Sequence, residues 1–98
     1  MILNEDLKNK IKNLFQEKKF IELINLIQNK IEPNQRPAYL WNLMGVARLS
    51  KKNPTKENLV LAINDFKEAY FKEKLSERVA EVLSNLINSS IELFDLDD

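Results

Sequence analysis

The chain contains no cysteine and no histidine among its 98 residues. Without cysteine it has no disulfide bonds and no thiolate chemistry. Without histidine it lacks the commonest metal ligand and the commonest general base. Zinc sites and nucleophiles activated by histidine are therefore excluded, and we expect a protein that is not an enzyme and holds no metal or cofactor.

Long apolar runs are also missing. No stretch approaches the roughly 20 apolar residues of a membrane span, and the start, MILNEDLKNK, lacks the apolar core of a signal peptide. The 15 basic and 15 acidic residues give a formal net charge of zero, which disfavours nonspecific binding to nucleic acid or to an anionic membrane. We therefore expect a cytoplasmic protein, or one soluble piece of a larger one, with neither nucleic acid nor membrane as its partner.

The chain has a single glycine, Gly45, and it lies inside AYLWNLMGVARL, a strongly helical pattern. Glycine within a helix costs about 0.5–1 kcal/mol relative to alanine, a cost usually tolerated where another backbone comes close. The next apolar segment, LVLAINDFKEAY, places Ala62, Phe66 and Ala69 on one helix face. Small residues on one helix and a large residue on the next predict a tightly packed helical pair.

Five segments of the chain have the three- and four-residue apolar spacing of amphipathic helices. The first begins at Asn4, a residue type that suits an N-cap. Glu5 and Asp6 occupy the following turn, where acidic residues are favourable. A turn at residues 16–19 separates it from the second helix, which ends before Pro33. No segment alternates apolar and polar residues as a half-buried strand does. The chain is therefore predicted to be all-α with antiparallel neighbouring helices.

Two polar loops precede the remaining helices. The third helix starts near Pro37, and Thr55 or the Asn53-Pro54 pair caps the fourth. Ser76 is the expected cap of the fifth helix, and acidic residues in its final segment, IELFDLDD, oppose the helix macrodipole. We expect this helix to fray before Asp95, or the native chain to continue. The predicted apolar stripe of the fifth helix comprises Val79, Val82, Leu83, Leu86, Ile87 and Ile91.

The sequence also has an internal repeat. A shift of 34 residues aligns the first helix with the third, and the same shift plus a five-residue insertion in the loop SKKNPTKEN aligns the second with the fourth. The combined shift also carries the third helix onto the fifth. The aligned pairs are Leu7/Trp41, Ile11/Gly45, Leu14/Arg48, Phe20/Leu59, Leu23/Ala62 and Ile27/Phe66.

A 34-residue helix-turn-helix period with W-x2-L-G followed by A-x3-F is the tetratricopeptide signature, and this chain resembles that family. Arg48 departs from the family pattern, which prefers tyrosine or another large apolar residue there. The first unit carries Ile11 and Leu23 where small residues are usual, so we expect its two helices to splay. The match is best in the second unit, where six residues agree in type: Trp41, Met44, Gly45, Ala62, Phe66 and Ala69.

The resemblance implies one domain over residues 1–98, a right-handed superhelical array with units at about 3–36 and 37–74 and a capping helix at 76–93. It also implies a protein- or peptide-binding scaffold, because the first helix of each unit in this family lines a concave groove that receives peptides. Carried over by position, the groove residues are Lys8, Lys12, Phe15, Tyr39, Asn42, Val46, Leu49, Arg78, Glu81, Asn85 and Asn88.

Some members of the family clamp the terminal carboxylate of a peptide with lysines, asparagines and an arginine. Lys8 and Arg78 fit such a clamp, but Leu43, Lys12 and Val82 occupy other clamp positions, which argues against a true carboxylate clamp. An acidic or mixed peptide as partner is the hypothesis that remains. The alternative explanation of these cations is an ordinary solvated surface.

Two further functions remain open. One is a non-catalytic N-terminal repeat segment of a larger enzyme, because bacterial glycosyltransferases and sulfotransferases carry such repeats upstream of their catalytic domains. The other is a small homo-oligomeric helical protein whose groove or last helix pairs with itself.

Overall fold

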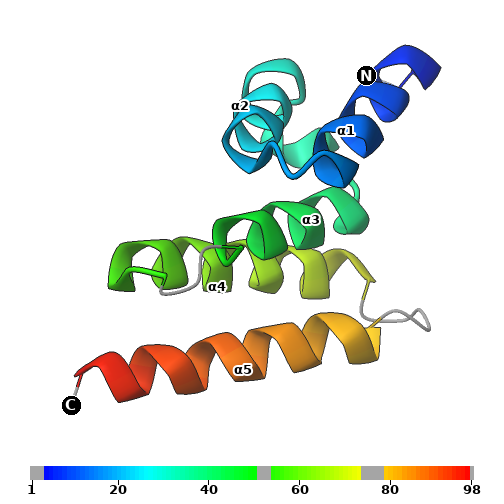
Figure 1. Cartoon of the computed structure of the whole chain (residues 1–98). Coiled ribbons are helices and arrows are strands. Elements are labelled where there is room, and N and C mark those ends of the chain that lie inside the picture. Colours follow the sequence, from blue (N-terminus) through cyan, green and yellow to red (C-terminus); the bar gives the residue numbers. More distant parts are fainter. Residues whose placement is uncertain (1–3, 51–53, 74–78, 98) are drawn as a thin grey trace. The chain divides into compact units, whose positions relative to one another are not determined.

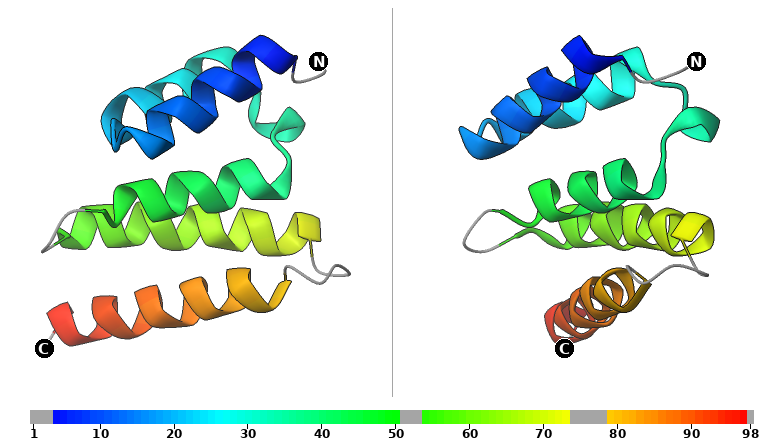
Figure 2. Two further views of the ribbon diagram at one scale, coloured as in Figure 1. Left: turned by 45° about the vertical axis from the view of Figure 1, so that its right-hand side comes forward. Right: turned by 90° about the vertical axis from the view of Figure 1, so that its right-hand side faces the viewer.

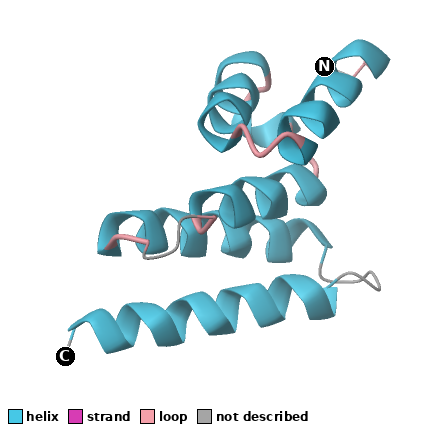
Figure 3. Cartoon of the chain, viewed as in Figure 1, coloured by secondary structure: helices cyan, strands magenta, loops and turns pink. Residues whose placement is uncertain are grey.

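The computed structural model describes residues 4–50, 54–73 and 79–97, and the side chains of 4–50, 54–72 and 83–93. The regular structure within these ranges is helical throughout, without strands, so the all-α prediction is confirmed there (Figure 3). The chain divides into two compact units, Met1–Arg36 and Pro37–Asp98. The helices are α1 (Glu5–Gln16), α2 (Phe20–Lys30), a 3-10 turn (Pro33–Gln35), α3 (Ala38–Arg48), α4 (Lys56–Glu73) and α5 (Val79–Asp97) (Figure 1).

Two helices start at side chains that the sequence marks as caps. The Oδ1 atom of Asn4 accepts a hydrogen bond of 2.8 Å from the backbone N–H three residues later, at the start of α1. The Oγ1 atom of Thr55 does the same before α4, at 3.1 Å. Each bond satisfies a backbone donor that the first helical turn leaves without an intrahelical partner. Both predicted caps are confirmed, whereas Asn53 and Ser76 lie outside the described residues.

In the first unit, α1 and α2 are antiparallel and pack against each other (Figure 2). Because their facing residues are mostly large aliphatics, the two backbones come close over a shorter stretch than those of α3 and α4. At the turn between them, the rings of Phe15 and Phe20 meet edge to face with centroids 5.8 Å apart. The buried apolar residues of this unit are Ile11, Leu14, Leu23, Ile27 and Ile31.

Helix α1 ends in a Schellman motif, in which two backbone N–H groups beyond the helix bond back to its last turn. The N–H of Lys19 donates to the carbonyl oxygen of Leu14 at 2.9 Å, and that of Lys18 donates to Phe15 at 3.1 Å. Lys18 therefore adopts a left-handed backbone conformation, with φ of 60°. Glycine usually occupies this position because it has no Cβ.

The proline-rich segment after α2 is more ordered than the plain loop that its sequence suggests. Its 3-10 turn begins at Pro33, whose fixed φ suits the first position of a helical turn. The side chain of Arg36 is buried, and its Nε donates to the backbone carbonyl of Ile31 at 2.9 Å. This bond closes the segment on itself at the end of the first unit.

The second unit contains three sequential antiparallel helices, with α4 packed against both α3 and α5 (Figure 2). The tetratricopeptide-like positions of α3 and α4 all lie in its core. The buried apolar residues are Ala38, Leu40, Trp41, Met44 and Ala47 of α3, and Leu59, Ala62, Phe66 and Ala69 of α4.

Helices α3 and α4 pack tightly at Gly45. A Cβ atom placed on Gly45 would lie 2.4 Å from Cε1 of the Phe66 ring and within 2.8 Å of two further ring atoms. Phe66 is 1% exposed, so this contact lies inside the core of the unit. The predicted contact between a small residue on one helix and a large residue on the next is therefore confirmed.

Helix α5 differs from its prediction at its C-terminal end and along its exposed face. It continues through Asp97, so the expectations that it ends at residue 93 and frays before Asp95 are wrong. The macrodipole penalty of an acidic residue near a helix C-terminus is only about 0.3–1 kcal/mol, too small to end the helix. Ile87 and Ile91 are each 54% exposed, because Ser89, on the roughly opposite side of the helix, is the buried residue.

None of the helices in the described ranges has the length and apolarity needed to cross a membrane. The right-handed superhelical array stays a prediction.

Candidate functional site

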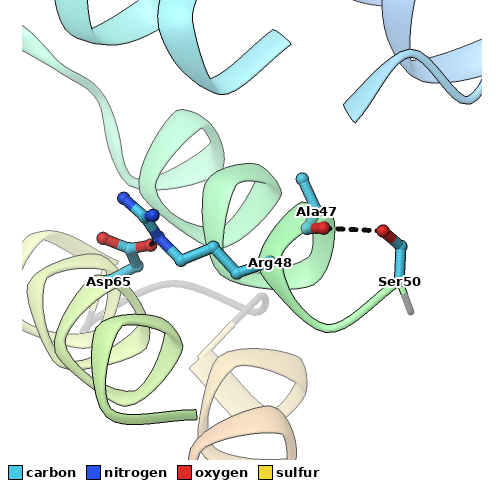
Figure 4. Close-up of polar contacts among 4 residues, drawn as sticks. All are labelled: Ala47, Arg48, Ser50 and Asp65. Carbon is cyan, nitrogen blue, oxygen red and sulfur yellow. Dashed lines mark hydrogen bonds and ion pairs between the residues drawn. The ribbon is translucent and has the colours of Figure 1, made fainter. Parts of the chain in front are cut away.

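The C-terminal end of α3 is fixed to α4 by an ion pair (Figure 4). Nε of Arg48 lies 2.5 Å from Oδ2 of Asp65, and the two side chains are only 12% and 4% exposed. Arg48 occupies the position where the tetratricopeptide family prefers a large apolar residue, and the aliphatic part of an arginine can pack in such a place. Two residues after Arg48, the hydroxyl of Ser50 donates to the carbonyl of Ala47 at 2.7 Å.

A second polar contact joins α3 to α5. Nδ2 of Asn85 donates to Oδ1 of Asn42 at 3.0 Å, and both residues are partly buried. The bond connects two helices that are separated in sequence by the whole of α4. It therefore helps to set the spacing between the faces of α3 and α5.

A cavity of about 310 Å³ lies beside this asparagine pair. This volume is at the small end of the range of about 300–1,000 Å³ for ligand pockets, and it is large enough to receive one side chain. The ring of Phe66 from α4 contributes to its apolar wall. The lining residues are Val46, Leu49, Ser50, Phe66, Asn85, Asn88, Ser89 and Glu92.

The polar groups of the lining differ in their availability to a ligand. The hydroxyls of Ser50 and Ser89 donate to backbone carbonyls, and the amide of Asn85 donates to α3. By contrast, the side chains of Asn88 and Glu92 form no hydrogen bond or ion pair with any residue that the structure describes. The cavity therefore offers a ligand an amide and a carboxylate above an apolar wall.

The structure brings together most of the groove residues predicted on α3 and α5. Asn42, Val46, Leu49 and Asn85 lie at or beside the cavity, as does Asn88. Tyr39 lies on α3 and is partly exposed but does not line the cavity. Arg78 and the side chain of Glu81 lie outside the described part of the chain.

The three groove residues predicted on α1 belong to the other compact unit. Lys8 is exposed and lies 4.0 Å from the carboxylate of Glu5, one turn earlier in the same helix. Lys12 is exposed, and Phe15 is half-buried against Phe20. The cavity is thus built from the second unit alone.

Four lining residues were missing from the predicted groove. Phe66 was assigned to the helical core, although one side of its ring also faces the cavity. Ser89 and Glu92 lie four and seven residues after Asn85, the spacing of one helix face, so the position of Asn85 could have indicated them. Ser50 likewise lies four residues after Val46, but just beyond the end of α3.

Comparison of the chain with protein-family models, with curated proteins and with solved structures found no match. The functional inference therefore rests on the residues of the cavity themselves. An apolar wall with one available amide and one available carboxylate is suited to noncovalent recognition.

Proposed function

We propose that this chain is a protein- or peptide-binding scaffold of the tetratricopeptide kind, and that the cavity between α3 and α5 receives one side chain of an extended peptide. The observation that carries the proposal is the cavity itself, formed beside the Asn42–Asn85 bond. The contact of Gly45 with Phe66 supports the resemblance of the second unit to a tetratricopeptide repeat.

The chemistry of the cavity fits a peptide ligand. Val46, Leu49 and Phe66 provide apolar surface, which gains free energy when a side chain displaces water from it. Primary amides can donate and accept at the same time, so Asn88 can bond both the N–H and the C=O of a peptide backbone. Binding of this kind needs no catalytic group.

The proposal is tested with peptides selected from a random library on the full chain, whose affinities are then measured by fluorescence anisotropy. Val46→Phe fills the cavity, and we expect it to weaken binding about tenfold or more, as loss of a central contact does. Val60→Phe is the matched control, because Val60 is an exposed valine of α4 that does not line the cavity.

Circular dichroism establishes that both variants are folded before binding is compared. Equal affinity of the Val46→Phe and Val60→Phe variants for the selected peptides would show that they bind elsewhere.

Self-association is a second candidate function, favoured by the exposure of Ile87 and Ile91 on α5. Two half-exposed isoleucines cover far less than the roughly 800 Å² per partner of a stable interface, so this candidate is the weaker one. Light scattering at micromolar concentration tests it directly, and a monomer mass would rule it out.

A further inference from the structure

We infer that the cavity between α3 and α5 selects a lysine or arginine side chain of its partner. The inference rests on the proposed function and adds the chemical class of the occupant. It follows from the charge of the lining, the shape of the cavity and the placement of its two available polar groups.

The charge of the cavity lining favours a cationic side chain. Glu92 is the one charged residue among the described residues that line the cavity, and within that part of the chain its carboxylate has no cationic partner. Arg48, which lies between two lining residues of α3 in sequence, instead reaches Asp65 on α4 (Figure 4). The lining therefore carries one negative charge and no positive one, and a cation complements it.

The size and apolar lining of the cavity favour a long side chain with a polar end. Val46, Leu49 and Phe66 form the apolar part of the lining, and the volume of about 310 Å³ accommodates one long side chain. Lysine and arginine carry three or four methylene groups that pack on apolar surface while the charged end reaches a polar rim. An acidic side chain has a shorter apolar stem and would place like charge beside Glu92.

The relative position of the Asn88 and Glu92 side chains also favours a cation. Asn88 and Glu92 are four residues apart on α5, so their side chains are neighbours on one face of the helix. The amide oxygen of Asn88 and the carboxylate of Glu92 both accept hydrogen bonds. A guanidinium, with five donors in a planar fork, can bond both acceptors at once, and an ammonium can bond them in turn.

This inference reverses the charge preference suggested by the sequence. The acidic-peptide hypothesis depended on Lys8, Lys12 and Arg78. Lys8 and Lys12 belong to the first unit, and Arg78 lies outside the described residues, so none of them contributes to the described lining.

The test uses three synthetic heptapeptides of glycine and serine that differ only in their central residue. One carries arginine, one carries citrulline, the neutral isostere of arginine, and one carries glutamate. Each is titrated into the ¹⁵N-labelled full chain, and dissociation constants are obtained from NMR shift changes. The proteins are the wild type, Glu92→Gln, and the control Glu68→Gln, which removes a charge from α4 away from the lining.

We expect the wild type to bind the arginine peptide about two- to fivefold more tightly than the citrulline peptide, since an exposed ion pair contributes modestly. This preference should vanish in Glu92→Gln, persist in Glu68→Gln and shrink as salt is added. The glutamate peptide should bind most weakly to the wild type.

Two results separate failure of this inference from failure of the proposed function. If arginine and citrulline peptides bind the wild type equally and Val46→Phe weakens both, the cavity binds peptides but does not select a cation. If the glutamate peptide binds most tightly, cation selection is likewise overturned. If none of the three heptapeptides binds, the inference fails while the library-selected peptides still test the proposed function; if Val46→Phe binds every peptide as the wild type does, both fail.

Discussion

The two helix pairs α1–α2 and α3–α4, which the predicted repeat aligns with each other, are packed by different means. In the second unit, Gly45 leaves room for the ring of Phe66, and no Cβ fits between them. The aligned residues of the first unit are Ile11 and Ile27, and both are buried. The second pair thus depends on a small residue opposite a large one, whereas the first uses aliphatic residues of equal size.

The same contrast applies to the polar contact between the helices. The second unit has the Arg48–Asp65 ion pair, whose charges are largely withdrawn from water. The corresponding positions of the first unit are Leu14 and Leu26, of which Leu14 is buried and Leu26 partly buried. The helix pair of the second unit is therefore stabilised by specific side-chain partners, whereas that of the first unit is stabilised by apolar burial. We expect the two helix pairs to respond differently to substitution.

The largest effect is expected from Asp65→Ala. Removing this carboxylate leaves the Arg48 guanidinium in a largely buried position without its partner, which typically costs about 3–5 kcal/mol. Chemical denaturation followed by fluorescence measures the effect, because the single tryptophan, Trp41, lies in the second unit and reports on its unfolding.

The double variant Arg48→Leu with Asp65→Leu is the control for this prediction. It places leucine at both positions, as in the first unit. Replacing a buried ion pair by apolar residues is often neutral or stabilising. We expect it to recover most of the stability lost in Asp65→Ala. A double variant as unstable as Asp65→Ala would mean that the site requires charge and not only volume.

A smaller loss is expected from Gly45→Ala. Alanine would improve the helix propensity of α3 by about 0.5–1 kcal/mol, but overpacking against a buried ring costs about 1–3 kcal/mol. The net effect should be a loss of about 1–2 kcal/mol, measured by the same Trp41 fluorescence.

Phe66→Leu supplies the matching control for Gly45→Ala. In its presence the added methyl group has more room, so the cost of Gly45→Ala should shrink, and the two substitutions should be non-additive. Additive costs, or a stabilised Gly45→Ala variant, would contradict the close packing of α3 and α4.

The smallest effect is expected in the first unit, from Lys18→Gly. Lys18 has a positive φ, and glycine adopts this conformation without the strain of a Cβ atom. Part of this gain is offset by the greater freedom of glycine in the unfolded chain, so we expect stabilisation of about 0.5–1 kcal/mol. This stabilisation should slow the hydrogen exchange of α1 amides and leave that of α3 amides unchanged. Faster exchange in α1 would contradict backbone strain at Lys18.

Local patterns in the sequence predicted the features of the fold that depend on neighbouring residues. Asn4 and Thr55 were identifiable as caps because a cap needs only a side chain and the turn that follows it. Gly45 and Phe66 were identifiable as partners because the cost of glycine in a helix indicates a close neighbour. The continuation of α5 to Asp97 was not predicted, because the interaction of acidic residues with the helix dipole is too small to end a helix.

The candidate site was predictable only in part, since it depends on contacts between distant residues. Asn42 and Asn85 were placed in the groove by their repeat positions, but nothing in the sequence indicates that they bond to each other. The partner of Arg48 was not predicted either, because Asp65 is an ordinary polar position in the helical pattern of α4. Glu92 gains its importance from the cavity beside it, which exists only once α3 and α5 are packed.

We propose above all that the partner binds in the cavity between α3 and α5. NMR shift mapping with a library-selected peptide on the ¹⁵N-labelled full chain tests this most directly. We predict that the largest shift changes occur at the backbone amides of Val46 and Leu49 and at the side-chain amides of Asn85 and Asn88, and that Val46→Phe abolishes them. Shift changes confined to α1 and α2, or to the exposed residues Ile87 and Ile91, would contradict the account.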